Sequence, residues 1–241
     1  MTHEFDKGYW QQHWQQGNGA AMSGSAPNPY LAREIRDLVP GTALDAGCGA
    51  GAEAIWLAAH GWDVTAVDIS AEALAQAAAR AAEGGTPDGV RWLEADLSSW
   101  QPDGRFDLVT THYAHPAVAQ LAFYERVATW VAPGGTLLIV GHLHHEGGQG
   151  QDHAQGESQG HGQGHGHGHG HGHGHGERHE EQRHQQEPPS EASVRAADVR
   201  ALLPDAEWDV VTAEEGQRTM TVPDGREVVL HDVVVRAIRT S

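Results

Sequence analysis

The chain has 241 residues and a formal net charge of −18, from 15 Lys+Arg against 33 Asp+Glu. Because nucleic acid and anionic membranes would repel so acidic a protein, these numbers exclude a broad surface for either partner. The single cysteine, Cys48, excludes an internal disulfide framework and a Cys-rich zinc fold. The sequence shows neither a signal peptide nor an apolar run long enough for a bilayer, so we expect a cytoplasmic protein.

Strand and helix patterns alternate through the first part of the chain, after an aromatic N-terminal segment over 1–30. In chain order they are a strand over 42–45, a helix over 52–60, a strand over 63–68, a helix over 71–83, strands over 90–94 and 106–111, a helix over 117–131 and a strand over 136–140. Ser70 is a natural N-cap for the helix that follows it. The turn Pro133-Gly134-Gly135 is expected to separate the last helix from the last strand.

Histidine is concentrated in the next part of the chain. Thirteen of the 19 histidines lie between His142 and His184, and a Gly-His alternation runs from Gly164 to Gly176. The stretch 147–189 contains no aliphatic residue larger than alanine and no aromatic residue, so it cannot bury an apolar face. Such a stretch cannot recover its ordering entropy. We therefore predict a disordered His/Gly-rich insertion over 144–190.

Regular patterns resume after the insertion, with a helix over 193–203 and strands over 208–213 and 227–236. No helix separates the last two strands, so they should pair antiparallel. The alternation before them favours a parallel sheet covered on both faces. The predicted fold is α/β: a doubly wound, Rossmann-like, mostly parallel sheet of seven strands, with an antiparallel strand near the C-terminus. The parts over 31–143 and 191–241 should form one domain.

A glycine-rich loop follows the first predicted strand, in Asp45-Ala46-Gly47-Cys48-Gly49-Ala50-Gly51. In doubly wound sheets, ligands bind at the carboxyl ends of the strands. Gly47, Gly49 and Ala52 match the pattern G-x-G-x-x-G/A, and Asp68 stands where an acid that binds ribose is expected. Alone, this loop is compatible with a nicotinamide or flavin dinucleotide and with S-adenosylmethionine.

Charge separates these two kinds of ligand. A dinucleotide brings an anionic pyrophosphate, which favours a helix N-terminus without carboxylates. Asp45 stands beside the loop and would attract the ammonium and sulfonium of S-adenosylmethionine. Asp68 could take both ribose hydroxyls, and Asp96 could accept from the adenine amino group. Each of these two acids alone could equally be a turn or cap residue, but acids after the first three strands in this order favour S-adenosylmethionine.

The runs LDAGCGAGAEAIWLAAHGWDVTAVDIS, WLEADL, FDLVTTHY and VAPGGTLLIVGH resemble class I S-adenosylmethionine-dependent methyltransferases. They are most similar to the small bacterial group related to the tellurite-resistance and thiopurine methyltransferases. The resemblance covers about 5–143 well and 191–239 more loosely. It implies cofactor contacts at these positions: Asp45, Gly47, Gly49, Asp68, Ile69, Asp96, Leu97, and Thr111 or His112. The family pattern says nothing about the His-rich insertion.

Methyl transfer to a small-molecule acceptor mainly requires proximity and alignment, because the sulfonium is already an activated leaving group. Where a base is needed, the candidates follow the fourth strand: His112, Tyr113 and His115. Imidazole suits that role, although these side chains could simply form a pocket wall or cap the next helix. The resemblance makes the N-terminal segment a lid, in which Tyr9, Trp10 and Trp14 could contact the substrate. Plain docking of an N-terminal helix on the core explains those aromatic residues equally well.

The insertion offers imidazoles for nickel, zinc or copper, without a fixed ligand spacing. Its central members are His165, His167, His169, His171, His173 and His175. A metal-buffering or metal-sensing protein that carries this tract on a methyltransferase-like fold is therefore the alternative function. A tolerated loop expansion without a role also fits, and a nicotinamide-dependent oxidoreductase is disfavoured by Asp45. The sequence identifies neither the acceptor nor the oligomeric state.

Overall fold

The structure is a computed structural model, and it describes residues 5–15, 26–85, 88–144, 192–221, 225 and 227–240. Nearly all of the predicted His/Gly-rich insertion, including the histidines predicted as metal ligands, lies outside these residues. Much of the linker between the predicted lid and the first core helix also lies outside them. Neither prediction for the insertion is tested by the fold. Among the helices of the described ranges, none has the length and apolar character that a membrane crossing requires.

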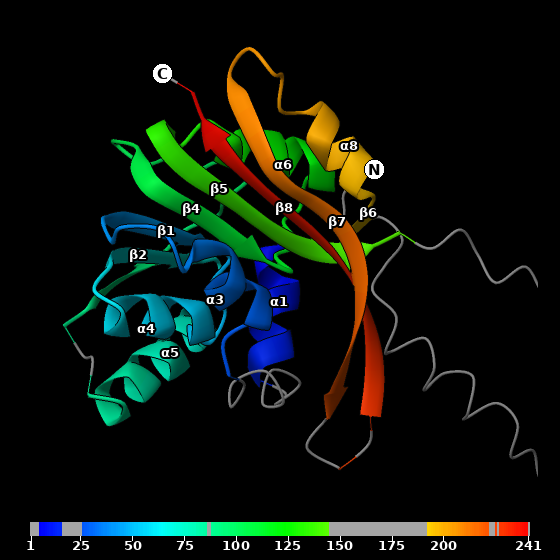
Figure 1. The fold of residues 1–241 in the computed structure, drawn as a ribbon. Helices are drawn as coiled ribbons and strands as arrows, with labels where there is room; N and C mark the ends of the chain where they lie inside the picture. Colours follow the sequence, from blue (N-terminus) through cyan, green and yellow to red (C-terminus); the bar gives the residue numbers. More distant parts are fainter. Residues whose placement is uncertain are drawn as a thin grey trace, which may run out of the picture. The chain divides into compact units, whose positions relative to one another are not determined.

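The described residues form one sheet whose strands run in the order β3-β2-β1-β4-β5-β8-β7 (Figure 1). The strands on this path are β1 (Thr42–Ala46), β2 (Asp63–Asp68), β3 (Val90–Glu94), β4 (Phe106–His112), β5 (Val131–Leu143), β7 (Trp208–Thr221) and β8 (Glu227–Arg239). The short β6 (Ser193–Val194) pairs with β5 off this path. The first five strands are parallel, and β8 is antiparallel to both β5 and β7. The predicted fold class is confirmed.

Alternation along each strand divides the core between the two faces of the sheet. In β1, Ala43 belongs to one buried cluster and Leu44 to the other. One face is covered by α3 (Pro29–Ile35), α4 (Ala52–Ala59) and α5 (Ala71–Glu83), and the other by α6 (Gln120–Ala128) and α8 (Ala196–Ala201) (Figure 1). Because both faces are covered, the strands are continuously apolar. This arrangement leaves the carboxyl ends of the parallel strands free to hold a site.

The boundary between α6 and β5 differs from the prediction. The helix predicted over 117–131 is confined to Gln120–Ala128, and β5 already begins at Val131, before the predicted turn at Pro133-Gly134-Gly135. The pairing of β4 with β5 shifts register between Phe106 and Leu108, so the turn residues form an irregularity inside the strand. A Cβ on Gly135 would lie 2.9 Å from the carbonyl oxygen of Ala132, which explains a glycine there.

The part after the insertion also differs in its boundaries. Residues predicted to begin a helix at 193 instead pair with β5, and α8 starts only at Ala196, whose N–H donates to Glu215 at 3.0 Å. The final hairpin is longer than predicted, because β7 and β8 pair from Trp208↔Arg239 to Thr221↔Glu227. Pairing of β8 with β5 ends at Asp232, so the far half of this hairpin extends beyond the sheet (Figure 1).

The aromatic N-terminal segment contains a helix, α1 (Lys7–Gln15), which contacts α5. Lys7 and Glu94 form an ion pair at 2.5 Å between α1 and the end of β3. Asn28 caps α3 by accepting from the N–H of Tyr30 at 3.0 Å, and its own N–H donates to Glu53 at 2.9 Å. These contacts hold the described part of the N-terminal segment against the carboxyl ends of the strands.

Candidate active site

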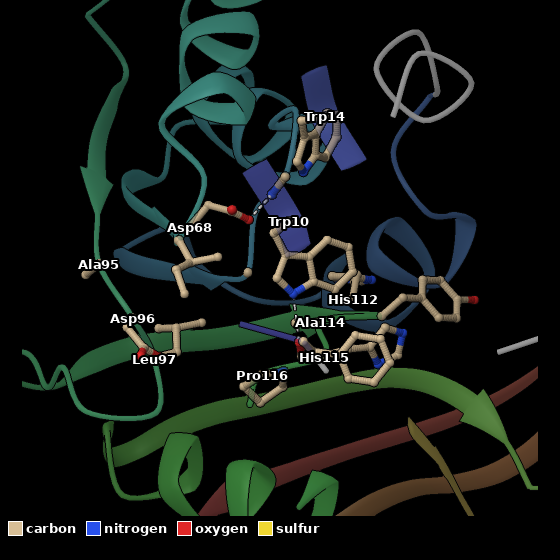
Figure 2. A pocket seen from close by; sticks show the side chains of 15 residues that line it. Trp10, Trp14, Asp68, Ala95, Asp96, Leu97, His112, Ala114, His115 and Pro116 are labelled. Atoms are coloured by element: carbon tan, nitrogen blue, oxygen red, sulfur yellow. Dashed lines mark hydrogen bonds between the residues drawn. The ribbon is translucent and has the colours of Figure 1, made fainter. Parts of the chain in front are cut away.

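A pocket of about 640 Å³, counting its open mouth, lies at the carboxyl ends of the parallel strands. One part, here called the acidic end, is formed by Gly47, Gly49, Asp68, Ile69, Asp96 and Leu97. The other, the aromatic end, is formed by Phe5, Trp10, His112, Tyr113, His115 and Pro116. In Figure 2, Asp68, Asp96 and Leu97 lie to one side of Trp10, and His112 and His115 lie to the other. Most of the predicted cofactor and acceptor residues therefore line one cavity, and Asp45, Thr111 and Tyr9 do not.

The glycine loop forms the floor of the acidic end. Gly47 follows β1 with φ of +81°, a conformation that costs a residue with a Cβ. A Cβ at Gly47 would also lie 2.3 Å from the Cβ of Ala114. The N–H groups of Gly47 and Cys48 both donate to the carbonyl oxygen of Val67, at 2.8 and 3.0 Å. The loop thus turns tightly against β2 and exposes its backbone to the pocket.

Asp68 closes the end of β2 and shapes this loop. Its Oδ2 accepts from the N–H of Gly49 at 2.8 Å (Figure 2). Its Oδ1 accepts from the N–H of Ser70 at 2.9 Å. Each carboxylate oxygen keeps a further lone pair for a ligand hydroxyl. Burial raises the pKa of Asp68, while the backbone N–H donors oppose that rise.

Two more of the predicted cofactor residues come from the segment after β3. Asp96 accepts from the N–H of Ser98 at 2.8 Å, which forms a short turn that places its carboxylate on the pocket. Leu97 is held by its carbonyl oxygen, which accepts from the guanidinium of Arg126 at 3.0 Å. Ile69, after β2, supplies another apolar part of the wall.

Asp45 and Thr111 are placed differently, because both are buried in the strands and neither lines the pocket. Asp45 is 1% exposed, and its Oδ2 has no hydrogen-bond partner within the described residues. Burial, with the charges of Glu53 and Asp68, raises the pKa of Asp45 well above its ordinary value. Three carboxylates thus lie near the glycine loop, and the groups that act on Asp45 include no cationic side chain, although Arg80 donates to the carbonyl oxygen of Ala50 in the loop at 2.8 Å. A cation bound at the loop would relieve this repulsion.

The loop after β4 forms the aromatic end. Tyr113 has φ of +53°, the one positive value among the described residues other than glycine. Its hydroxyl donates to Asp232 Oδ1 at 2.6 Å, and Arg218 donates to the same hydroxyl at 3.1 Å and to Asp232 Oδ2 at 2.8 Å. These contacts compensate for the strained backbone. Burial and the charge of Asp232 raise the pKa of Tyr113, so its hydroxyl is protonated and already in use as a donor.

The two candidate histidines differ in their contacts. One ring nitrogen of His112, Nε2, lies 2.8 Å from Thr110 Oγ1, and its Nδ1 is buried without a partner within the described residues. His115 likewise has a buried Nδ1 without a partner there. Burial lowers the pKa of His112, and it lowers that of His115 to about 4. Both imidazoles are therefore neutral near pH 7.

Helix α1 covers the aromatic end. The indole N–H of Trp10 donates to the carbonyl oxygen of His115 at 3.1 Å (Figure 2). Phe5 packs on Trp10 and His115, with ring centroids 6.0 and 5.9 Å away. Trp14 also lines the pocket, whereas Tyr9 does not and is 41% exposed. Of the three aromatic residues predicted to contact a substrate, Trp10 and Trp14 are placed to do so.

Sequence reasoning missed three side chains that act on this end. His142 stacks on His115 with centroids 5.2 Å apart and lies 4.7 Å from the ring of Tyr113. Arg218 and Asp232 hold the Tyr113 hydroxyl from the final hairpin. His142 could have been found from its place at the end of a predicted strand. Nothing local in the sequence marks Arg218 or Asp232, because the pairing of β7 with β8 brings them together.

Fold and pocket define the class: a doubly wound α/β domain with a pocket beside its first glycine loop, at the carboxyl ends of the strands. Residues 43–135 match the sequence family described as "Methyltransferase domain". Ribosomal RNA small subunit methyltransferase C of Alcanivorax borkumensis is 36% identical over 107 residues, which cover 42% of this chain and 32% of that protein. The 2-heptyl-1-hydroxyquinolin-4(1H)-one methyltransferase of Mycobacteroides abscessus is 30% identical over 119 residues, or 47% of this chain and 52% of that protein.

Solved structures agree in fold. Magnesium protoporphyrin IX methyltransferase from Synechocystis PCC 6803, determined with bound SAH, has a TM-score of 0.62 at 16% identity and covers 97% of this chain and 99% of its own. The chain spans less than two thirds of the length of the curated relatives named above. The family match over residues 43–135, with the fold, supports a class I S-adenosylmethionine-dependent methyltransferase domain in that part of the chain.

Proposed function

We propose that this chain transfers a methyl group from S-adenosylmethionine to a small-molecule acceptor held at the aromatic end. The observation that carries the proposal is the group of carboxylates at the glycine loop, where a buried Asp45 has an oxygen without a partner within the described residues. A methionine ammonium and sulfonium would supply the missing positive charge. An anionic pyrophosphate would add to the repulsion, so a dinucleotide fits poorly.

The other acids support the same ligand. Asp68 keeps free lone pairs on both oxygens after accepting from Gly49 and Ser70, as a partner for two ribose hydroxyls requires. Asp96 and Leu97 lie where an adenine would reach them, with one polar and one apolar contact. We assign these residues to the nucleoside and the glycine loop to the methionine part.

Bound in this way, S-adenosylmethionine supplies an activated methyl group, and the residues of this chain align the acceptor with it. Of the three candidate catalytic residues, His112 and His115 both line the pocket and both have an Nδ1 free of partners in the described part of the chain. We place His115 first because the other ring nitrogen of His112 already lies beside Thr110. We assign Tyr113 a positioning role, since its hydroxyl is already bound by Asp232 and Arg218. His112 remains the second candidate, with one nitrogen near Thr110.

The acceptor class follows from charge and from the relatives taken together. A net charge of −18 opposes nucleic acid, although one relative is named for ribosomal RNA. The relative named for a hydroxyquinolone acts, by its name, on a small aromatic molecule. We therefore propose a small molecule and leave nucleic acid as the outcome that would correct this assignment.

Calorimetry with S-adenosylmethionine and with NAD tests the cofactor. The full chain should bind S-adenosylmethionine and not NAD. Asp68→Asn should weaken S-adenosylmethionine binding by about tenfold or more, because a charged acceptor of hydrogen bonds becomes a neutral one. Asp63→Asn is the matched control, because Asp63 is the exposed first residue of the same strand and should leave binding unchanged. Absence of S-adenosylmethionine binding, or equal loss in both variants, would overturn the proposal.

A further inference from the structure

Near-parallel rings form the wall of the aromatic end. The planes of Phe5 and Trp10 differ by 26°, those of Trp10 and His115 by 21°, and those of His115 and His142 by 21°. Phe5, Trp10 and His115, from the N-terminal segment and the loop after β4, line the pocket, and His142 at the end of β5 stacks on His115 without lining the pocket itself. Pro116 and Ala114 add further apolar contacts beside it. Such a surface favours an aromatic ligand that can stack on it.

The aromatic end carries no net charge, although several ionisable groups lie at it or beside it. Burial lowers the pKa of His115 to about 4. Burial, with the nearby His115 and Arg218, lowers that of His142 to about 3. Arg218 is the nearby cation, and the carboxylate of Asp232, which is fully buried, pairs with it at 2.8 Å. Among the described residues that line this end, none is expected to carry a charge near pH 7.

Hydrogen bonding at this end is also nearly complete. The Trp10 indole donates to His115, and the Tyr113 hydroxyl to Asp232. The Nδ1 atoms of His115 and His112 are the ring nitrogens of the lining that lack a partner within the described ranges. A neutral imidazole can accept one hydrogen bond there. The site therefore offers a ligand stacking and one or two acceptors, without an ionic partner.

We propose that the methyl acceptor is an uncharged aromatic molecule whose nucleophile is a phenol-type hydroxyl or an aromatic thiol, hydrogen-bonded to His115. This inference rests on the proposed methyl transfer. An anionic acceptor, such as a carboxylate or a metalloid oxyanion, would lose its hydration at this wall without gaining an ionic partner. Of the two groups that the sequence resembles, this inference favours the thiopurine methyltransferases over the tellurite-resistance methyltransferases.

The reaction balances as follows. The nucleophile X–H gives its electron pair to the methyl carbon, the carbon–sulfur bond breaks, and its pair stays on sulfur as S-adenosylhomocysteine forms. The proton from X passes to His115 Nδ1 and then to solvent. Because His115 is a weak base while buried, acidic hydroxyls and thiols should react best. Ordinary phenol and alkyl thiol side chains have pKa values of about 10 and about 8.5, and aliphatic alcohols should not react.

Matched probes test the inference on the full chain saturated with S-adenosylhomocysteine. 2-Naphthol is the uncharged probe, 2-naphthalenethiol is its more acidic thiol analogue, 6-hydroxy-2-naphthoate carries the same rings with a carboxylate, and selenite is the small oxyanion. We expect 2-naphthol to bind at least about tenfold more tightly than the naphthoate, measured by calorimetry and by quenching of tryptophan fluorescence. With S-adenosylmethionine, 2-naphthalenethiol should be methylated faster than 2-naphthol, and selenite should not be methylated.

Two variants separate stacking from the role of His115. His115→Phe should keep 2-naphthol binding within about threefold while lowering its methylation rate by about tenfold or more, as loss of a proton acceptor does. Leu121→Ala, a partly buried change on α6 outside the pocket lining, is the control. Preference for the naphthoate or selenite, or no binding of any naphthalene probe, would overturn the acceptor class. Binding of S-adenosylhomocysteine would still stand in that case, whereas its failure would remove the proposed function itself.

Discussion

The acidic end and the aromatic end of the pocket treat charge in opposite ways. Beside the acidic end, the charges of Glu53 and Asp68 raise the pKa of the buried Asp45, and no cationic side chain appears among the groups that act on it. At the aromatic end, Arg218 and Asp232 cancel, and burial keeps the histidines neutral. Under the proposed function, the acidic end would favour a cationic ligand because charge there is uncompensated, and the aromatic end would favour an uncharged ligand. A cationic methyl donor and an uncharged acceptor would be brought together by this difference.

The largest effect should follow from breaking the neutrality of the aromatic end. Asp232→Ala leaves the half-buried Arg218 without its ionic partner and Tyr113 without its hydrogen-bond acceptor. Loss of one partner of a buried pair costs about 3 kcal/mol, measured as the free energy of unfolding in urea. The double variant Arg218→Met/Asp232→Ala should recover part of that loss, because no unpaired charge remains. Equal loss in single and double variants would mean that the pair does not act as a unit.

Acidification should weaken the aromatic end next. The folded-state pKa values of His115 and His142 lie near 4 and 3, below the ordinary value of about 6.5. The unfolded chain therefore binds protons first, and stability, which is full above pH 6.5, falls as the pH decreases toward 4. We expect a loss of about 2 kcal/mol at pH 5 from each of these two histidines.

Replacing His142 tests that assignment. His142→Phe keeps an aromatic ring against His115 and Tyr113 and removes one titrating group. The slope of unfolding free energy against pH between 6.5 and 5 should become clearly shallower in this variant. His60→Phe is the control, because His60 lies at the end of α4, where its ring stacks on Trp56 away from the pocket. A slope unchanged by His142→Phe would contradict the origin proposed here.

Sequence reasoning predicted the acidic end well because that end is local in sequence. The glycine loop directly follows β1, and Asp68 and Asp96 follow β2 and β3, so strand periodicity alone brings them to one edge of a parallel sheet. The buried position of Asp45 could not be predicted, since its neighbour Glu53 reaches it only through the packing of α4 on the sheet.

The aromatic end was harder to predict because it is assembled from distant segments. Tyr113 looked like a candidate base from its position, but Asp232, 119 residues away, holds its hydroxyl. That contact depends on the register of β7 with β8 and on a hairpin longer than the apolar pattern indicated. The extra length consists of polar and apolar residues that pair without covering a core, so hydrophobic periodicity gives no signal for it.

The smallest of the expected effects would sharpen the comparison most, because it moves stability and binding in opposite directions. In the parent protein the pKa of the buried Asp45 is raised, so ionisation of this carboxyl destabilises the free protein increasingly as the pH rises above the ordinary pKa of an aspartate. Asp45→Asn removes that destabilising charge. At pH 7 the variant should unfold about 2–4 °C higher than the parent, equivalent to about 1 kcal/mol. S-adenosylmethionine should bind about tenfold more weakly, or about 1.4 kcal/mol, because the cation loses its buried counter-charge. A variant that lost both stability and affinity would show instead that Asp45 serves the packing of the loop, and the contrast between the two ends would then rest on Asp68 and Asp96 alone.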